Sequence, residues 1–330
     1  MTDSRTWSLT ISVLVSPARR DTALRGFAAT IPPQAAARLA RDPRIAYYET
    51  DGIAHAIGRP DAGGKPVNAL PPPQVTDWGV NRVCGNDLCT VPSNVGTAWI
   101  IDTGIDLNHP DLNVDVNRSV SFVRKKTTPD DGNGHGTHVA GIIAAINNGT
   151  YTVGVAAGAT VVAVRVLDSS GSGLWSWVIA GVDYVAANAD PTDVANMSLG
   201  GSYNYSVNLA VTTASATCSF EVAAGNESDD ADNHSPASAS ISSEDRVYTI
   251  SAIDSSDDFA WFSNWGNPPV DFAAPGVSIL SLWKGGGTKT LSGTSMAAPH
   301  VAGLLLLGPV RSNGTAIGDP DDSADPIAHH

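Results

Sequence analysis

The pattern of apolar and polar positions predicts strands that alternate with helices over residues 97–303. Helical patterns occupy residues 135–145 and 175–187, and a small-residue run from Ser292 to Gly303 leads into an apolar helical face. Near-continuous apolar runs of strand length, typical of parallel strands covered on both faces, occupy residues 97–101, 160–167, 194–199, 220–226, 247–252 and 270–274. This alternation predicts an α/β fold with a doubly wound, mostly parallel sheet.

The N-terminal residues show a different pattern. Residues 7–15 alternate apolar and polar side chains like a half-buried strand, and residues 23–31 can form a second strand. Residues 33–39 are rich in alanine and begin with proline, which favours a helix, and residues 45–50 are again strand-like. A small α+β unit is therefore expected before the main domain. Residues 58–73, rich in Gly, Pro and Asn, predict an exposed linker.

Charge differs between these two parts and narrows the choice of partners. Residues 1–70 carry nine Lys/Arg and six Asp/Glu, which is a net charge of +3. Because the whole chain has a formal net charge of −14, residues 71–330 have a net charge of −17. Nucleic acids and anionic membrane surfaces attract basic proteins, so neither is expected as a partner. No run approaches the roughly 18 apolar residues of a membrane span, and the N-terminus shows no signal-peptide pattern.

Three cysteines are too few for a disulfide scaffold. Cys84 and Cys89 are close enough along the chain to bridge across the intervening turn. Cys218 has apolar neighbours, which favour a buried thiol over a reactive one.

Four polar residues in glycine-rich settings are candidates for chemistry. Asp102 follows the apolar run 97–101, His135 stands where a Gly-rich loop opens into a helix, Asn226 ends a predicted strand, and Ser295 follows Gly293 in a turn. Nucleophilic acyl transfer needs a hydroxyl, an imidazole base, a carboxylate that orients it, and a donor for the oxyanion.

Each of these residues also has a plainer interpretation on its own. A serine before a small-residue helix is often a cap, and an Asp-Thr-Gly is often a turn. His135 and His138 have the spacing of a zinc pair, but no third ligand is apparent and zinc is not expected.

Three separated motifs together resemble the subtilisin-like serine proteases, or subtilases. They are Ile101-Asp-Thr-Gly-Ile-Asp106 with His109-Pro-Asp-Leu112, His135-Gly-Thr-His-Val-Ala-Gly141, and Gly293-Thr-Ser-Met-Ala-Ala-Pro-His-Val-Ala-Gly303. The chain order Asp, His, Ser is that of subtilisin. The resemblance implies that Ser295 is the nucleophile, His135 the general base and acid, Asp102 the orienting carboxylate and Asn226 the oxyanion donor.

The resemblance also implies a substrate cleft and a calcium site. A polypeptide substrate would add as an antiparallel strand between two strand edges, with Trp175 either walling a distal pocket or packing in the core. The cleft residues are Gly171, Ser172, Gly173, Trp175, Ser198, Leu199 and Gly200. A structural Ca²⁺ would take oxygens from a set of side chains and carbonyls: Gln74, Asp111, Ile146, Asn148, Thr150 and Thr152.

Residues 1–57 resemble an abbreviated form of the family's inhibitory propeptide, residues 58–73 are the linker, and residues 74–310 are the catalytic domain. Residues 311–330 are polar and acidic, and a disordered tail is expected there in place of the family's further helices and strand. The missing elements suggest a C-terminally truncated domain of reduced stability.

The leading interpretation is a secreted, monomeric, calcium-stabilised serine endopeptidase made as a zymogen, with its propeptide as intramolecular inhibitor. The alternative is a catalytically silent subtilase fold that acts as a binding or scaffold protein. A lipase or esterase fits less well, because the chain order differs and Gly293-x-Ser295-x-Ala297 lacks the second glycine of the hydrolase elbow.

Overall fold

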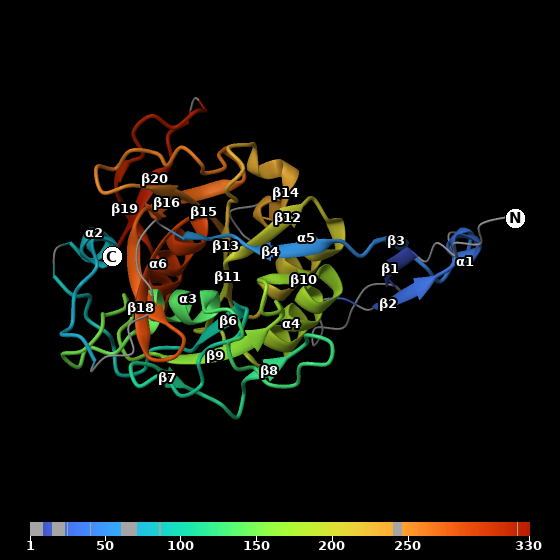
Figure 1. The fold of residues 1–330 in the computed structure, drawn as a ribbon. Coiled ribbons are helices and arrows are strands. Elements are labelled where there is room, and N and C mark those ends of the chain that lie inside the picture. Colours follow the sequence, from blue (N-terminus) through green and yellow to red (C-terminus); the bar gives the residue numbers. More distant parts are fainter. Residues whose placement is uncertain are drawn as a thin grey trace, which may run out of the picture.

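A ten-stranded sheet runs through the main body of the computed structural model (Figure 1). The structure describes residues 9–14, 24, 26–39, 41–60, 71–85, 87–239, 246–321 and 323–330. In sheet order the strands are β19 (Arg311–Thr315), β20 (Pro326–His329), β16 (Val270–Pro275), β15 (Val247–Ile253), β13 (Ser219–Ala223), β11 (Val194–Met197), β6 (Ala98–Asp102), β9 (Thr160–Arg165) and β7 (Asn113–Val114), with β8 (Val120–Ser121) also on β9. All neighbours are parallel except β19 and β20.

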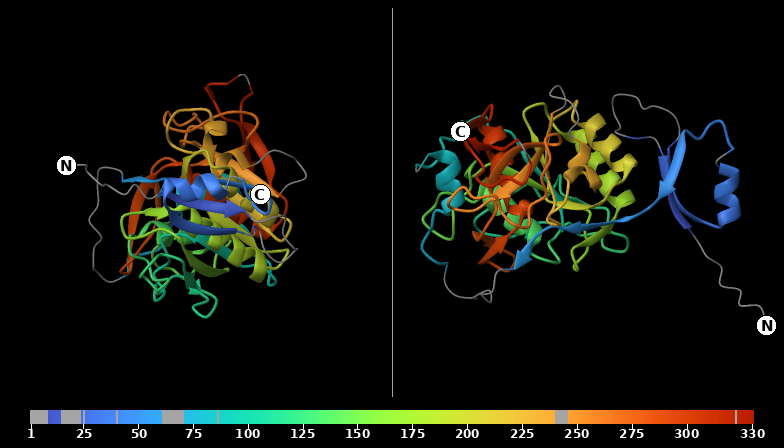
Figure 2. Two further views of the ribbon diagram at one scale, coloured as in Figure 1. Left: turned by 90° about the vertical axis from the view of Figure 1, so that its right-hand side faces the viewer. Right: turned by 90° about the horizontal axis from the view of Figure 1, so that it is seen from above.

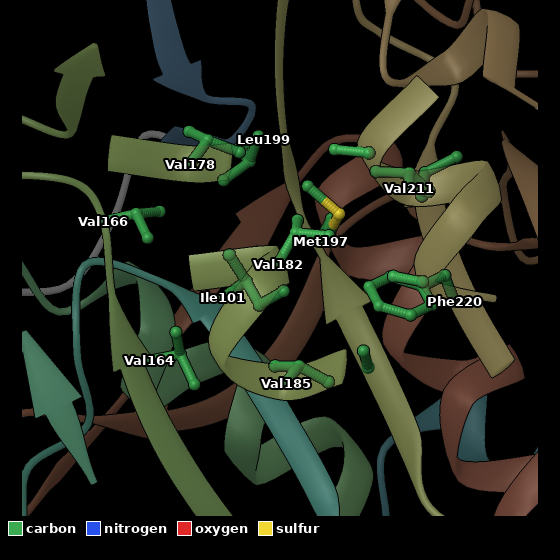
Figure 3. Packing of buried hydrophobic residues seen from close by; sticks show 14 of the residues in the cluster. Ile101, Val164, Val166, Val178, Val182, Val185, Met197, Leu199, Val211 and Phe220 are labelled. Carbon is green, nitrogen blue, oxygen red and sulfur yellow. The ribbon is translucent and has the colours of Figure 1, made fainter. Parts of the chain in front are cut away.

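Helices cover both faces of this sheet, as a parallel sheet requires. Alternate residues of β6 point to opposite faces of the sheet. Trp99 and Ile101 pack with α4 (Trp175–Asn188) and α5 (Tyr205–Ala214) on one face. Ala98 and Ile100 pack with α3 (His135–Ala144) on the other face. Figure 3 shows the first of these cores, where valines of α4 meet Met197 and Phe220. The predicted α/β fold with a doubly wound, mostly parallel sheet is confirmed.

A central helix and a short one complete the second face. Helix α6 (Thr294–Leu307) packs against β13, β15 and α3, and α2 (Trp78–Cys84) packs beside it. Among the described residues, no helix is long and apolar enough to cross a membrane.

A small unit precedes the main body. Strands β1 (Leu9–Leu14), β2 (Gly26–Ile31) and β3 (Tyr47–Thr50) form an antiparallel sheet in the order β2-β1-β3, accompanied by helix α1 (Pro33–Leu39). The strands and the helix expected there are therefore present, although residues 7, 8, 15, 23 and 25 lie outside the described part. In the right-hand view of Figure 2 this unit stands beside the body and joins it through an extended segment.

That extended segment becomes part of the main body. Strand β4 (Ile53–Ala56) lies in a second sheet in the order β10-β4-β12-β14, formed with β10 (Ser172–Leu174), β12 (Leu199–Ser202) and β14 (His234–Ser235). Strand β5 (Arg59–Pro60) then pairs with β18 (Gly287–Ser292), which pairs with β17 (Ile279–Trp283). Of the predicted linker, residues 61–70 lie outside the described part.

The expectation of a disordered C-terminal tail is wrong. Strands β19 and β20 form a hairpin, and Ile327 of β20 pairs with Ala273 at the edge of the main sheet. Ile327 and Asp325 are fully buried, and the Asp325 carboxylate accepts hydrogen bonds from Ser251 and Asn267. Polar composition misled the prediction, because three buried apolar residues (Ala316, Ile327 and Ala328) and one hydrogen-bonded carboxylate are enough to anchor the segment to an existing sheet edge.

The cysteines take the predicted places. Cys84 and Cys89 form a disulfide across the turn after α2, with their Cα atoms 5.1 Å apart. Cys218 is a buried thiol, and burial raises its pKa far above the usual range.

Candidate active site

Asp102 and His135 meet at the carboxyl edge of the main sheet. Asp102 is the last residue of β6 and His135 the first of α3, and His135 Nδ1 lies 2.9 Å from each carboxylate oxygen of Asp102. Burial by itself opposes protonation of His135, but the charge and the hydrogen bond of Asp102 outweigh it and raise the pKa of the imidazole. Asp102 is therefore placed to stabilise the protonated imidazole of His135.

Ser295 lies in the first turn of α6, beside this pair. Its hydroxyl donates to the backbone carbonyl of Ser198 at 2.9 Å, and the Ser198 hydroxyl donates back to the Ser295 carbonyl. His135 Nε2 is buried and has no hydrogen-bond partner among the described residues. The serine hydroxyl is thus turned toward the carbonyl of Ser198, directly before β12, and it does not donate to the imidazole in this structure.

Asn226 presents its amide to a backbone carbonyl of the N-terminal segment. Its Oδ1 accepts from the backbone N–H and the hydroxyl of Thr294, both at 3.0 Å, which directs Nδ2 the other way. Nδ2 donates to the carbonyl oxygen of Ile57 at 3.0 Å. A side-chain amide held from behind in this manner is a preorganised donor for charge on that oxygen.

The Ile57–Gly58 peptide bond lies between the serine helix and the histidine. A Cβ placed on Gly293 would come within 2.5 Å of the Ile57 carbonyl oxygen, so only glycine leaves room for this carbonyl. A Cβ placed on Gly58 would lie 3.1 Å from His135 Nε2. The edge of the imidazole that carries the unpartnered nitrogen therefore lies next to Gly58, the residue on the amine side of this peptide bond.

Strand β4 lies between β10 and β12, the two strands at which the expected cleft residues stand (Figure 1). It is antiparallel to both, with Ser172, Gly173 and Leu174 opposite His55, Ala54 and Ile53, and Leu199 and Gly200 opposite Ala56 and His55. The pairing continues to the end of the strand, because Ala56 N donates to Gly171 O at 2.8 Å and Ile57 N to Ser198 O at 3.4 Å.

Trp175 takes the core position that was one of its two expected roles. It is 2% exposed and packs in the same core cluster as Ala54 of β4. Its indole also lies against Gly52 and Gly201, where an added Cβ would come within 3.0 Å of the ring. Trp175 is therefore a core residue whose ring edge borders Gly52 and Gly201.

Asp131 is a residue of this site that the sequence motifs did not identify. Its buried carboxylate accepts from the hydroxyls of Thr103 and Thr137 and from the backbone N–H groups of Asn133, Gly134 and Thr137. It thereby ties the residue after Asp102 to the start of the helix that carries His135. An Asp just before a helix in a Gly-rich loop is the sequence signal that could have suggested this capping role.

His138 lies apart from the proton-transfer pair. Burial lowers its pKa to about 3, and its Nε2 contacts the carbonyl of Lys289. Among the described residues, no cluster of three or more His, Cys, Asp or Glu side chains is arranged to hold a metal.

The residues expected to bind calcium lie together around residues 146–152. Gln74 Oε1 accepts from the N–H groups of Asn148 and Gly149, and the Asn148 side chain donates to Asp111 Oδ1 at 2.7 Å. Asp111 Oδ2 is buried without a partner in the described structure, and burial raises the pKa of this carboxyl to about 6. Asn148 Oδ1 accepts from the N–H and the hydroxyl of Thr150, so the side-chain nitrogen of Asn148 is the atom that faces Asp111. The buried carboxylate oxygen without a donor is the feature of this loop that fits a hard cation. Ile146, Thr150 and Thr152 lie in the same loop.

Known proteins resemble this chain over most of its length. Residues 99–308 match the model of the subtilase family. The chain is 42% identical over 299 residues to the alkaline serine exoprotease A of Vibrio alginolyticus, covering 87% of this chain and 52% of that protein. It is 40% identical over 294 residues to the alkaline serine protease ver112 of Corniculantispora psalliotae, covering 85% of this chain and 70% of that protein.

A solved structure gives the same result. The crystal structure of a cold adapted subtilisin-like serine proteinase matches with a TM-score of 0.63 at 39% identity, covering 76% of this chain and 97% of the other. The chain spans about half the length of the Vibrio relative.

Proposed function

The chain belongs to the subtilase family, and from that premise we propose that it is a serine endopeptidase, made as a zymogen, that cleaves polypeptides through an acyl-enzyme at Ser295. The observation that carries the proposal is a peptide bond of the chain itself lying in the site. The Ile57 carbonyl accepts from Asn226 Nδ2, and the strand leading to it is paired on both sides.

The proposed chemistry assigns one task to each residue. The Ser295 hydroxyl oxygen attacks the carbonyl carbon while His135 Nε2 takes its proton, and Asp102 stabilises the imidazolium through Nδ1. Asn226 Nδ2 and the Ser295 backbone N–H stabilise the oxyanion. His135 then gives its proton to the leaving amine, and water, deprotonated by the same imidazole, releases the acyl group as a carboxylate.

The same proposal makes residues up to Ile57 an intramolecular inhibitor, and Ile57–Gly58 the bond that the enzyme cuts in itself. Two carboxylates support this assignment by attaching the segment to the body beyond the cleft. Asp51 accepts from the N–H and hydroxyl of Ser176, and Glu49 accepts from the N–H of Ser206. The N-terminal product stays bound by these contacts after cleavage and blocks the cleft until it is removed.

Calcium is proposed as a structural ion at the 146–152 loop. Asp111, Asn148 and Gln74 would supply side-chain oxygens, and Ile146, Thr150 and Thr152 would supply carbonyls. Bound there, the ion would neutralise the buried Asp111 carboxylate and stabilise the loop.

An extracellular, monomeric protein is the remaining part of the proposal. The disulfide between Cys84 and Cys89 supports an oxidising compartment. The name of the Vibrio relative includes the word exoprotease, which agrees with that location.

The decisive experiment compares wild type with Ser295→Ala and His135→Ala. Wild type should convert into two fragments, and N-terminal sequencing of the larger one should begin at Gly58 or at a residue trimmed back from it. Both variants should stay intact. A fluorophosphonate probe should label Ser295 in processed wild type and not in His135→Ala. An intact, unlabelled wild-type chain would support the silent scaffold instead.

A further inference from the structure

The two strands that flank the cleft each lead into a helix beyond its upstream end. Strand β10 ends at Leu174, directly before α4, and β12 ends at Ser202, shortly before α5. Because β4 is antiparallel to both, the starts of α4 and α5 lie where the chain enters the cleft. Neither helix has an acidic residue in its first turn.

The start of α4 is completed by a carboxylate from the N-terminal segment. Its own cap, Leu174, has no side-chain hydrogen bond to the helix. Asp51, which is 8% exposed, accepts from Ser176 N at 2.9 Å and from Ser176 Oγ at 2.7 Å. The charge is therefore held at the positive end of the helix dipole and largely removed from water.

The start of α5 receives a second carboxylate. Glu49 Oε1 accepts from Ser206 N at 2.8 Å, and the Tyr47 hydroxyl lies 2.9 Å from Ser206 Oγ. The rings of Tyr47 and Tyr205 meet edge to face with centroids 5.1 Å apart. Glu49 lies in β3 and Asp51 follows directly after that strand. Positions two apart in extended chain share one side, so both carboxylates face the body and each reaches the start of one helix.

These contacts have a fixed register relative to the peptide bond in the site. Asp51 is six residues and Glu49 eight residues before Ile57. The residues between are held by β4 pairing and by the bond from Trp175 N to Gly52 O at 3.1 Å. Once the N-terminal unit has left, a substrate in the same register brings its own residues at these positions to the same two helix starts.

We propose that the starts of α4 and α5 form an extended substrate site, made by Ser176, Ser206 and the N–H groups there. This site selects polypeptides that carry acidic residues at two positions, six and eight residues before the residue whose carbonyl is attacked. This selectivity rests on the proposed endopeptidase function. The net negative charge of residues 71–330 disfavours acidic substrates in general. A preference for acidic residues at these two positions would therefore have to come from local contacts at the helix starts.

The test uses three quenched fluorescent peptides and the processed enzyme. The first peptide has the sequence of residues 47–60, the second carries Glu49→Gln and Asp51→Asn in that sequence, and the third begins at Ile53. The acidic peptide should show kcat/KM about tenfold above the neutral one, mostly through KM, and the ratio should fall in 0.5 M salt. Cleavage should occur at the same bond in all three.

A pair of enzyme variants locates the effect. Ser176→Asp with Ser206→Asp places carboxylates at both helix starts and should bring the ratio of acidic to neutral peptide to one or below. The matched Ser176→Asn with Ser206→Asn has nearly the same shape without charge and should keep the ratio above one, while the short peptide reports any general loss of activity. Equal kcat/KM for acidic and neutral peptides in wild type would overturn the extended site. Failure to cleave any peptide, including the short one, would overturn the endopeptidase function itself.

Discussion

Glu221 is expected to make the protein lose stability as the pH rises. It lies in β13 between Phe220 and Val222, which face the core shared with α4 and α5, so its side chain points to the opposite face of the sheet. Glu221 is fully buried, and neither carboxylate oxygen has a hydrogen-bond partner in the described structure. Burial raises the pKa of this carboxyl well above its ordinary value.

The direction and size of the effect follow from proton linkage. The folded state holds a proton on Glu221 at pH values where the unfolded chain, with a pKa near 4.3, has released it. The free energy of unfolding therefore falls by about 1.4 kcal/mol per pH unit between the unfolded and folded pKa values. Glutamine resembles the neutral acid and does not titrate, so Glu221→Gln removes this dependence. Over the pH range in which the folded state keeps this proton and the unfolded chain has released it, the variant should gain about 1.4 kcal/mol per pH unit relative to its parent.

The assay is urea unfolding from pH 5 to pH 8 in a Ser295→Ala background, which prevents self-digestion. Other buried acids, such as Asp77 and Asp325, contribute equally to parent and variant and cancel in the difference. Glu227→Gln, the same substitution at a carboxyl that is half exposed, is the matched control. A difference between Glu221→Gln and its parent that stays constant across this range would refute the reasoning.

Three further predictions concern other parts of the molecule. Asp131→Asn should reduce kcat/KM and move the acid limb of the pH profile of kcat/KM to lower pH, because a charge that raises the pKa of His135 is lost. An acid limb at the same pH in variant and wild type would argue against an effect of Asp131 on the pKa of His135. Asp325→Ala should lower the free energy of unfolding by about 1–3 kcal/mol in urea titrations, since the buried Ser251 hydroxyl loses its acceptor, and an unchanged midpoint would show that the contacts of Asp325 are dispensable. In the uncut Ser295→Ala variant, in which Gln74 already contacts the 146–152 loop, a calcium chelator should lower the melting temperature. Asp111→Asn should abolish that response. Equal melting curves with and without chelator would contradict the calcium proposal.

The sequence predicted the elements whose pattern is local. The apolar runs at β6, β9, β11, β13, β15 and β16 and the helices α3, α4 and α6 were recognisable because each buries a continuous face. Helix α5 was missed, since its stripe is interrupted by Asn208, Thr212 and Thr213. Residues 311–330 were misjudged for a related reason: the five residues of β19 are all exposed, and only a few side chains near β20 are buried.

The sequence by itself also determined which residue types the site contains, because the motifs around Asp102, His135 and Ser295 name a carboxylate, an imidazole and a hydroxyl in a known order. Only the tertiary structure decided which peptide bond lies among them. The position of Ile57 in the site follows from the register of β4 against two strands more than a hundred residues away, and pairing between such distant segments leaves no local pattern in the chain. The orientation of the serine hydroxyl and the carboxylates at the starts of α4 and α5 depend on the same long-range packing.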